Sequence, residues 1–170
     1  MTILAKPTKS GWNLKFMLTH PAHFFSLGFG SGLAKIAPGT FGSLVGLALF
    51  WLIATQTMLM QLCIIGSFFV VGIYFCSVTG KALGVPDHGS IVWDEIVAMM
   101  LVLTVTPKEW LWWLVALLLF RLFDIWKPYP IRQFDARFKN GFGVMFDDLL
   151  AAFYAILSLK IIGWVMMHGR

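Results

Sequence analysis

The chain has 170 residues, of which 59% are hydrophobic and 12% are charged. A typical soluble domain carries about 25% charged residues, so this composition excludes an ordinary soluble domain. The length suits one compact unit over residues 1–170, with a basic N-terminal tail over 1–20. The net charge of +5 comes from basic residues beside apolar runs, so we expect a membrane and an anionic phospholipid as partners, not nucleic acid. The oligomeric state stays open.

Five apolar stretches follow one another along the chain, and they predict an all-α, multi-pass membrane bundle. They cover residues 41–55, 58–78, 91–105, 110–126 and 149–167. A membrane-spanning helix needs about 20 residues, which the second and fifth stretches provide and the fourth nearly provides. The first and third are short, and the third opens with two acids, so it could start in the headgroup region or be covered by protein in place of lipid. We therefore expect four or five spans.

The distribution of lysine and arginine predicts the orientation of these spans. If all five stretches cross and the N-terminus is cytoplasmic, nine basic residues lie inside and two outside. The inner residues are Lys6, Lys9, Lys15, Lys35, Lys81, Lys127, Arg132, Arg137 and Lys139, and the outer ones are Lys108 and Arg170. Basic residues concentrate on the cytoplasmic side, so we expect the polar segments to face the cytoplasm.

The first polar segment, residues 28–43, reads GFGSGLAKIAPGTFGS and is too rich in glycine for a regular helix. Glycines let backbone N–H groups approach an anion, and Thr40 and Ser43 add hydroxyl groups. Two interpretations remain open for this segment. It is either a phosphate cradle around Gly39 or a flexible entry to the first span.

The second polar segment, residues 87–95, reads DHGSIVWDE and contains an adjacent pair of acids. Ser90 is a suitable N-cap for a helix that would begin near it. Asp94 and Glu95 then project about 100° apart, so one of them at most faces directly inward. Acids in a first turn also suit the helix dipole, but a pair inside an apolar run favours metal binding. Asp87 is a candidate catalytic residue, and His88 is more typical of a hydrogen-bonded loop residue than of a catalyst.

The third segment contains Arg121, Asp124 and Lys127, which share one helical face because they are spaced three residues apart. One interpretation is a ladder of salt bridges that neutralises Asp124. The other makes Arg121 and Lys127 phosphate clamps and Asp124 a metal ligand, because arginine offers a fork for phosphate oxygens and lysine a point charge.

The fourth segment, residues 141–148, reads GFGVMFDD and places a glycine turn before Asp147 and Asp148 at the start of the last helix. Capping could explain one of the two acids, but hardly both. All four segments lie beside long apolar runs. The carboxylates of the last three are therefore costly to desolvate, and carboxylates in such places are usually functional. Because the chain lacks the motifs of a covalent phosphatase nucleophile, metal-activated water is the expected nucleophile.

These segments together resemble the phosphatidylglycerophosphatase A family of bacterial inner-membrane lipid phosphatases. The likeness runs through residues 28–44, 87–97, 121–135 and 141–151, in order and with similar spacing. It implies an all-helical fold with the site at the cytoplasmic face. It also implies Mg²⁺-dependent removal of the terminal phosphate from phosphatidylglycerophosphate, which gives phosphatidylglycerol.

The site expected from the residues and the resemblance has three sets of members. The metal ligands are Asp94, Glu95, Asp124, Asp147 and Asp148, and Mg²⁺ is the expected ion. The catalytic set is Asp87, Asp94, Glu95, Asp124 and Asp148. Which of these carboxylates acts as the general base stays open. The phosphate-binding set is Gly39, Thr40, Ser43, Arg121 and Lys127. The alternative is a small ion-coupled transporter subunit, which would place its acids near the middle of the bilayer.

Overall fold

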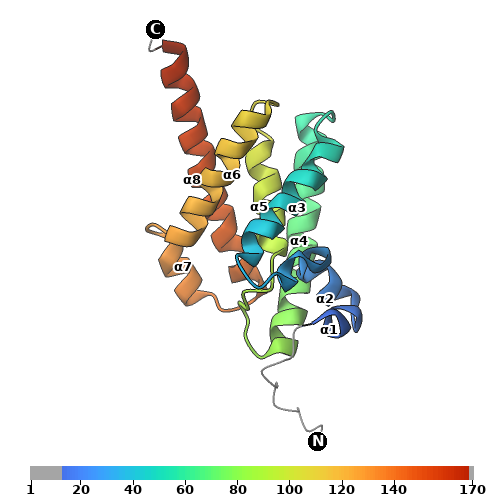
Figure 1. The fold of residues 1–170 in the computed structure, drawn as a ribbon. Helices are drawn as coiled ribbons and strands as arrows, with labels where there is room; N and C mark the ends of the chain where they lie inside the picture. The colour runs from blue at the N-terminus through green and yellow to red at the C-terminus, as the bar shows by residue number, and fades with distance from the viewer. Residues whose placement is uncertain (1–12, 169–170) are drawn as a thin grey trace, which may run out of the picture.

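The computed structural model describes residues 13–168, and within this range the chain is helical and contains no strand (Figure 1). The helices in order are α1 (Leu14–Leu18), α2 (Pro21–Ser26), the 3₁₀ helix η1 (Gly28–Leu33), α3 (Pro38–Ile53), α4 (Met58–Leu83), α5 (Trp93–Leu103), α6 (Trp110–Trp126), α7 (Ile131–Arg137) and α8 (Gly141–His168). The all-α prediction is confirmed for the described residues.

The five predicted apolar stretches correspond to α3, α4, α5, α6 and α8, but several boundaries differ from expectation. Helix α6 covers the predicted range, whereas α8 begins at Gly141 and includes the expected glycine turn in its first turn. Helix α5 begins at Trp93 with Val92 as N-cap, so the expectation for Ser90 was wrong. The Ser90 hydroxyl instead lies 2.7 Å from Nδ1 of His88, and this local contact uses the group that would have capped the helix.

The glycine-rich segment also differs in part from its prediction. Gly28, Phe29 and Gly30 have positive φ angles of 54°, 59° and 102°, as expected for a segment that is no regular helix. However, residues 28–33 form η1, and α3 already begins at Pro38, a residue suited to the first helical position because it lacks an N–H.

Helix α5 lies in the middle of the bundle, between α3 and α6 in Figure 1, and it also packs against α4 and α8. Nine of its 11 residues are buried, so protein covers this short helix. Helix α3 approaches it through glycine: a carbon added at Gly46 would lie 2.6 Å from the Ile96 carbonyl oxygen. This close contact between backbones fixes where α5, and hence Asp94 and Glu95, sits within the bundle.

Helix α8 is held against α4 near its start. A carbon added at Gly141 would lie 2.7 Å from the backbone nitrogen of Ser77, so only glycine fits there. Further along α4, Gly72 makes room for the indole of Trp93, whose Nε1 donates a hydrogen bond to the Phe68 carbonyl at 3.0 Å. These contacts bring the starts of α5 and α8 to the same part of α4, around Gly72 and Ser77.

Two helices, α4 with 26 residues and α8 with 28, are long and apolar enough to cross a membrane. Helix α3 is apolar but shorter, and α5 and α6 have 11 and 17 residues. The structure thus contains two candidate spans among residues 13–168, compared with the four or five expected.

Candidate functional site

Three helices bring the five predicted metal ligands together where α5 and α8 begin and α6 ends (Figure 1). Asp94 and Glu95 lie in the first turn of α5, and Asp124 lies in the last turn of α6. Asp147 and Asp148 lie in the second turn of α8. The acids therefore lie near the starts of α5 and α8 and the end of α6.

The closest group of carboxylates consists of Asp94, Glu95 and Asp148. One oxygen from each lies within 4.8 Å of the others, a spacing from which a single cation could be held. Asp94 and Asp148 are 7% and 3% exposed, and Glu95 is half-buried. Both acids of the α5 pair reach this point, because the longer glutamate side chain compensates for its position on the next face of the helix.

Several oxygens in this cluster are buried without any hydrogen-bond donor among the described residues. They are Oδ1 of Asp94, Oε2 of Glu95, Oδ1 of Asp147 and Oδ2 of Asp148. A buried carboxylate oxygen without a donor costs free energy unless a cation compensates it. An all-oxygen set of carboxylates is the set that Mg²⁺ prefers, so these residues fit the ion that the resemblance implies.

Arg121 and Lys127 flank the cluster and pair with the two remaining acids. Nη1 of Arg121 lies 2.5 Å from Oδ2 of Asp124 and 3.7 Å from Oε1 of Glu95. Nζ of Lys127 lies 2.5 Å from Oδ2 of Asp147. The salt-bridge ladder was thus right for Arg121 and Asp124, whereas Lys127 reaches across to α8. Nε of Arg121 is buried and donates to no described group.

The backbone at Lys127 directs this contact. Lys127 ends α6 with a φ angle of 45°, in the left-handed region that non-glycine residues rarely adopt. Burial alone would lower the pKa of Lys127, but the carboxylates of Asp147 and Asp135 outweigh it and raise this pKa above its usual value. The ammonium group therefore stays charged across the physiological pH range.

Helix capping does not explain the acids of α8. The first turn of α8 contains no acid, and the N–H of Gly143 donates to Oδ1 of Asn140 at 2.9 Å. Asn140 therefore does the capping, and Asp147 and Asp148 lie beyond the first turn, where the helix dipole gives little benefit. Asp94 and Glu95 do lie in a first turn, so the dipole remains part of their explanation.

The glycine-rich segment meets the cluster at Gly39. A carbon added there would collide with Oε1 of Glu95 and lie 2.8 Å from both terminal nitrogens of Arg121. Ser43 is buried and its hydroxyl donates to the Gly39 carbonyl at 2.9 Å, while the N–H of Thr40 donates to the Ala37 carbonyl at 3.0 Å. Of the predicted phosphate-binding residues in this segment, Gly39 has the most direct contact with the acids.

Asp87 and His88 lie in the connection between α4 and α5, outside the group of three carboxylates. Asp87 is exposed, and Nδ1 of His88 both contacts the Ser90 hydroxyl and accepts a hydrogen bond from the Ser90 N–H at 3.2 Å. His88 is therefore the hydrogen-bonded loop residue that the sequence favoured. The catalytic role expected of Asp87 stays a prediction.

Sequence reasoning missed two residues that support the site. Asp135 lies in α7 and pairs with Lys139 at 2.9 Å and with Lys127 at 3.4 Å. The hydroxyl of Tyr154 donates to the Tyr129 carbonyl at 2.9 Å and ties the turn after Lys127 to α8. The spacing of Asp135 and Lys139 by four residues was a signal for a helical pair. No local signal marks Tyr154.

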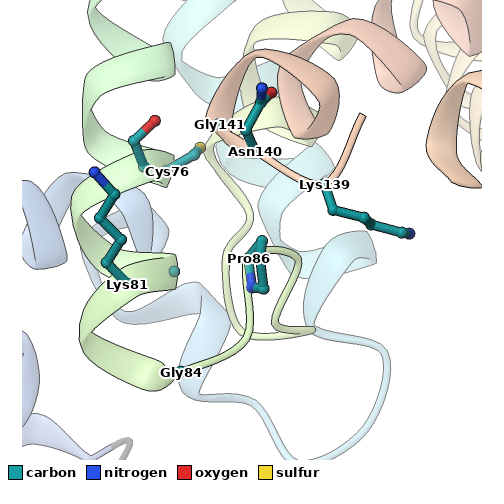
Figure 2. Close-up of a pocket in the computed structure, with 9 residues that line it drawn as sticks. Cys76, Lys81, Gly84, Pro86, Lys139, Asn140 and Gly141 are labelled. Atoms are coloured by element: carbon teal, nitrogen blue, oxygen red, sulfur yellow. The ribbon is translucent and has the colours of Figure 1, made fainter. Parts of the chain in front are cut away.

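A cavity of about 320 Å³ lies between the end of α4 and the start of α8 (Figure 2). Lys81 and Lys139 stand on opposite sides of it, and Pro86 and Asn140 also line it. None of the clustered carboxylates lines this cavity, so it is separate from the candidate site.

Two apolar helices of spanning length, with carboxylates and cationic side chains gathered where α5 and α8 begin, suit a membrane-associated phosphatase. The family model for phosphatidylglycerophosphatase A matches residues 24–163. The chain belongs to the phosphatidylglycerophosphatase A family, which confirms the resemblance seen in its sequence.

Individual relatives agree with the family assignment. A phosphatidylglycerophosphatase A of Haemophilus influenzae is 46% identical over 160 residues, covering 90% of this chain and 95% of that protein. The phosphatidylglycerophosphatase A of Escherichia coli is 38% identical, covering 96% and 95%. A putative phosphatidylinositol-3-phosphatase of Bacteroides thetaiotaomicron is 35% identical, covering 82% and 91%. No solved structure matches the chain.

Proposed function

We propose that this protein is a Mg²⁺-dependent lipid phosphatase that converts phosphatidylglycerophosphate to phosphatidylglycerol and inorganic phosphate. Family membership supports the substrate and the reaction. The observation that carries the metal dependence is the group formed by Asp94, Glu95 and Asp148, whose buried oxygens lack donors. Such a group is suited to a hard divalent cation.

The proposed metal ligands are Asp94, Glu95 and Asp148, with the free oxygen of Asp147 beside them. Bound Mg²⁺ would lower the pKa of a coordinated water and neutralise charge on phosphoryl oxygens. Asp124 and Asp147 each bind a cationic side chain, so we assign them first to holding Arg121 and Lys127 in position.

Arg121 and Lys127 are the proposed phosphate-binding residues. The buried Nε of Arg121 has no acceptor, and a phosphoryl oxygen would provide one. Gly39 has no side chain at the point where Glu95 and Arg121 come together, so it lets both side chains approach the backbone of α3. In the reaction, water attacks phosphorus, the bond from phosphorus to the glycerol oxygen breaks, and that oxygen takes a proton. The two cations stabilise the charge on the departing phosphate.

The proposed location is the bacterial inner membrane, with several spans and the site at the cytoplasmic face. The excess of basic residues in the predicted inner segments supports this orientation. Trp126 and Tyr129, near the carboxylate site, are both largely exposed, as aromatic residues at the headgroup level of a bilayer are.

The proposal is tested by phosphate release from phosphatidylglycerophosphate in detergent micelles with purified protein. We expect chelation followed by dialysis to abolish turnover and added Mg²⁺ to restore it. Full activity in excess EDTA after such dialysis would contradict the metal assignment. No release with Mg²⁺ present would contradict the substrate assignment.

A further inference from the structure

A second recess lies beside the carboxylate site, where α6 ends and α7 begins. It is an open groove of about 660 Å³, and its lining residues are Trp126, Lys127, Pro128, Tyr129, Arg132, Gln133 and Ala136. Lys127 belongs to both places: its ammonium group pairs with Asp147, and the residue also lines the groove. The groove therefore shares Lys127 with the proposed phosphate-binding residues.

Arg132 gives this groove a cation that no protein anion neutralises. Its side chain is exposed, and it forms no ion pair with a carboxylate between residues 13 and 168. By contrast, Arg121, Lys127 and Lys139 all pair with carboxylates. An unpaired guanidinium beside a phosphate-binding lysine is suited to a second anionic group, which its planar fork can bind through two hydrogen bonds.

The walls of the groove are held in place. The Tyr129 carbonyl accepts the hydrogen bond from Tyr154 of α8, and Ile131, the first residue of α7, is fully buried. Trp126 and Tyr129 are 68% and 75% exposed, so the groove has aromatic side chains at its rim. Aromatic residues of this kind concentrate at the headgroup level of a bilayer, where a lipid phosphate would lie.

We propose that this groove holds the phosphodiester phosphate of the lipid substrate and that Arg132 recognises it. This inference rests on the proposed function. The substrate carries two phosphates separated by one glycerol unit. With the terminal phosphate at Arg121 and Lys127, the diester phosphate lies on the far side of Lys127, which is the position of the groove. Arg132 would then distinguish this lipid from phosphomonoesters that lack a diester phosphate.

The test compares Arg132→Gln with Arg137→Gln, a matched control on the same helix. Arg137 is also exposed, and its guanidinium lies 5.9 Å from the ring centre of Phe138 outside the groove. The substrates are phosphatidylglycerophosphate in neutral detergent micelles and glycerol 3-phosphate, a soluble monoester without a diester. We expect Arg132→Gln to raise KM for the lipid about tenfold, because the variant loses hydrogen bonds between the guanidinium and a charged phosphate. The change in kcat should be much smaller.

The decisive quantity is the ratio of kcat/KM for the lipid to that for glycerol 3-phosphate. This ratio should fall at least about fivefold in Arg132→Gln, recover in part in Arg132→Lys, and stay at the wild-type value in Arg137→Gln. An equal loss on both substrates, or no loss on the lipid, would overturn the inference while leaving the phosphatase assignment intact. A wild-type protein that releases phosphate from neither substrate would overturn both.

The micelles also separate two sources of diester phosphate, because they contain no anionic lipid besides the substrate. A defect that persists in them identifies the substrate's own phosphate as the ligand. A defect that appears only after another anionic phospholipid is added would mean that Arg132 binds the membrane surface, and the inference would be wrong.

Discussion

The ammonium of Lys127 lies 2.5 Å from the carboxylate of Asp147, although Lys127 ends α6 and Asp147 lies in the second turn of α8. The same ammonium group also lies 3.4 Å from Oδ2 of Asp135. A single lysine thus connects α6, α7 and α8 at the edge of the carboxylate cluster. Substitutions can distinguish the acids that bind a metal from the acids that pair with a cationic side chain.

Asp148→Asn should reduce phosphate release from phosphatidylglycerophosphate by about a hundredfold or more, because it removes a charge that a metal site needs. The same change should raise the melting temperature of the metal-free protein, since it relieves repulsion among Asp94, Glu95 and Asp148. Both effects are measured on one purified sample, by phosphate release and by thermal unfolding in EDTA.

The matched control is Asp135→Asn. Asp135 pairs with Lys127 and Lys139 and is partly exposed, and such ion pairs contribute about 0–1 kcal/mol. We expect a loss of activity of a few-fold at most, with no gain in metal-free stability. Near wild-type activity of Asp148→Asn at limiting Mg²⁺ would remove Asp148 from the metal site.

Gly39→Ala should inactivate the protein, because the added methyl would collide with Glu95 and lie 2.8 Å from the Arg121 nitrogens. We expect at least about a tenfold loss of kcat/KM and a destabilisation of about 1–3 kcal/mol from overpacking. Gly66→Ala is the control, since an added carbon there has no neighbour within 4 Å. If both variants behaved alike, Gly39 would have no special role.

Tyr154→Phe should loosen the turn that follows Lys127. It removes the hydrogen bond to the Tyr129 carbonyl, and a loss of about 0.5–1.5 kcal/mol of unfolding free energy is expected. KM for phosphatidylglycerophosphate should rise while the Mg²⁺ concentration for half-maximal activity stays constant. Tyr74→Phe is the control, because the Tyr74 hydroxyl is exposed and has no hydrogen bond within the described range. A changed Mg²⁺ requirement in Tyr154→Phe would contradict a role limited to the turn.

The proposed orientation predicts which introduced cysteines an impermeant thiol reagent reaches in intact cells. Lys81→Cys and Lys139→Cys should react only after the cells are permeabilised, whereas Lys108→Cys should react at once. The variants are made in a Cys63→Ser background, because Cys63 is exposed while Cys76 is buried. Labelling of positions 81 and 139 from outside would reverse the orientation.

Local sequence patterns were sufficient for much of the helical structure. Helix α6 coincides with its apolar run, because a stretch that is apolar except for Arg121 and Asp124 and is ended by Lys127 and Pro128 leaves the backbone little choice. The start of α5 was misplaced at Ser90, since His88 uses the hydroxyl that would have capped it. The role of Asp135 was not predicted, because its pairing with Lys127 depends on the packing of α7 against the end of α6 and not on a local pattern.

By itself, the sequence determined the helical class, the apolar runs, the family and the identity of the acids, because each of these depends on composition or on residues close together in the chain. The tertiary structure decided which acids meet. It grouped Asp94 and Glu95 with Asp148, gave Lys127 to Asp147, and placed Gly39 against Glu95. These contacts join residues on different helices. They depend on how closely the glycines let α3 approach α5 and let α8 approach α4, and no periodicity along the chain encodes such distances.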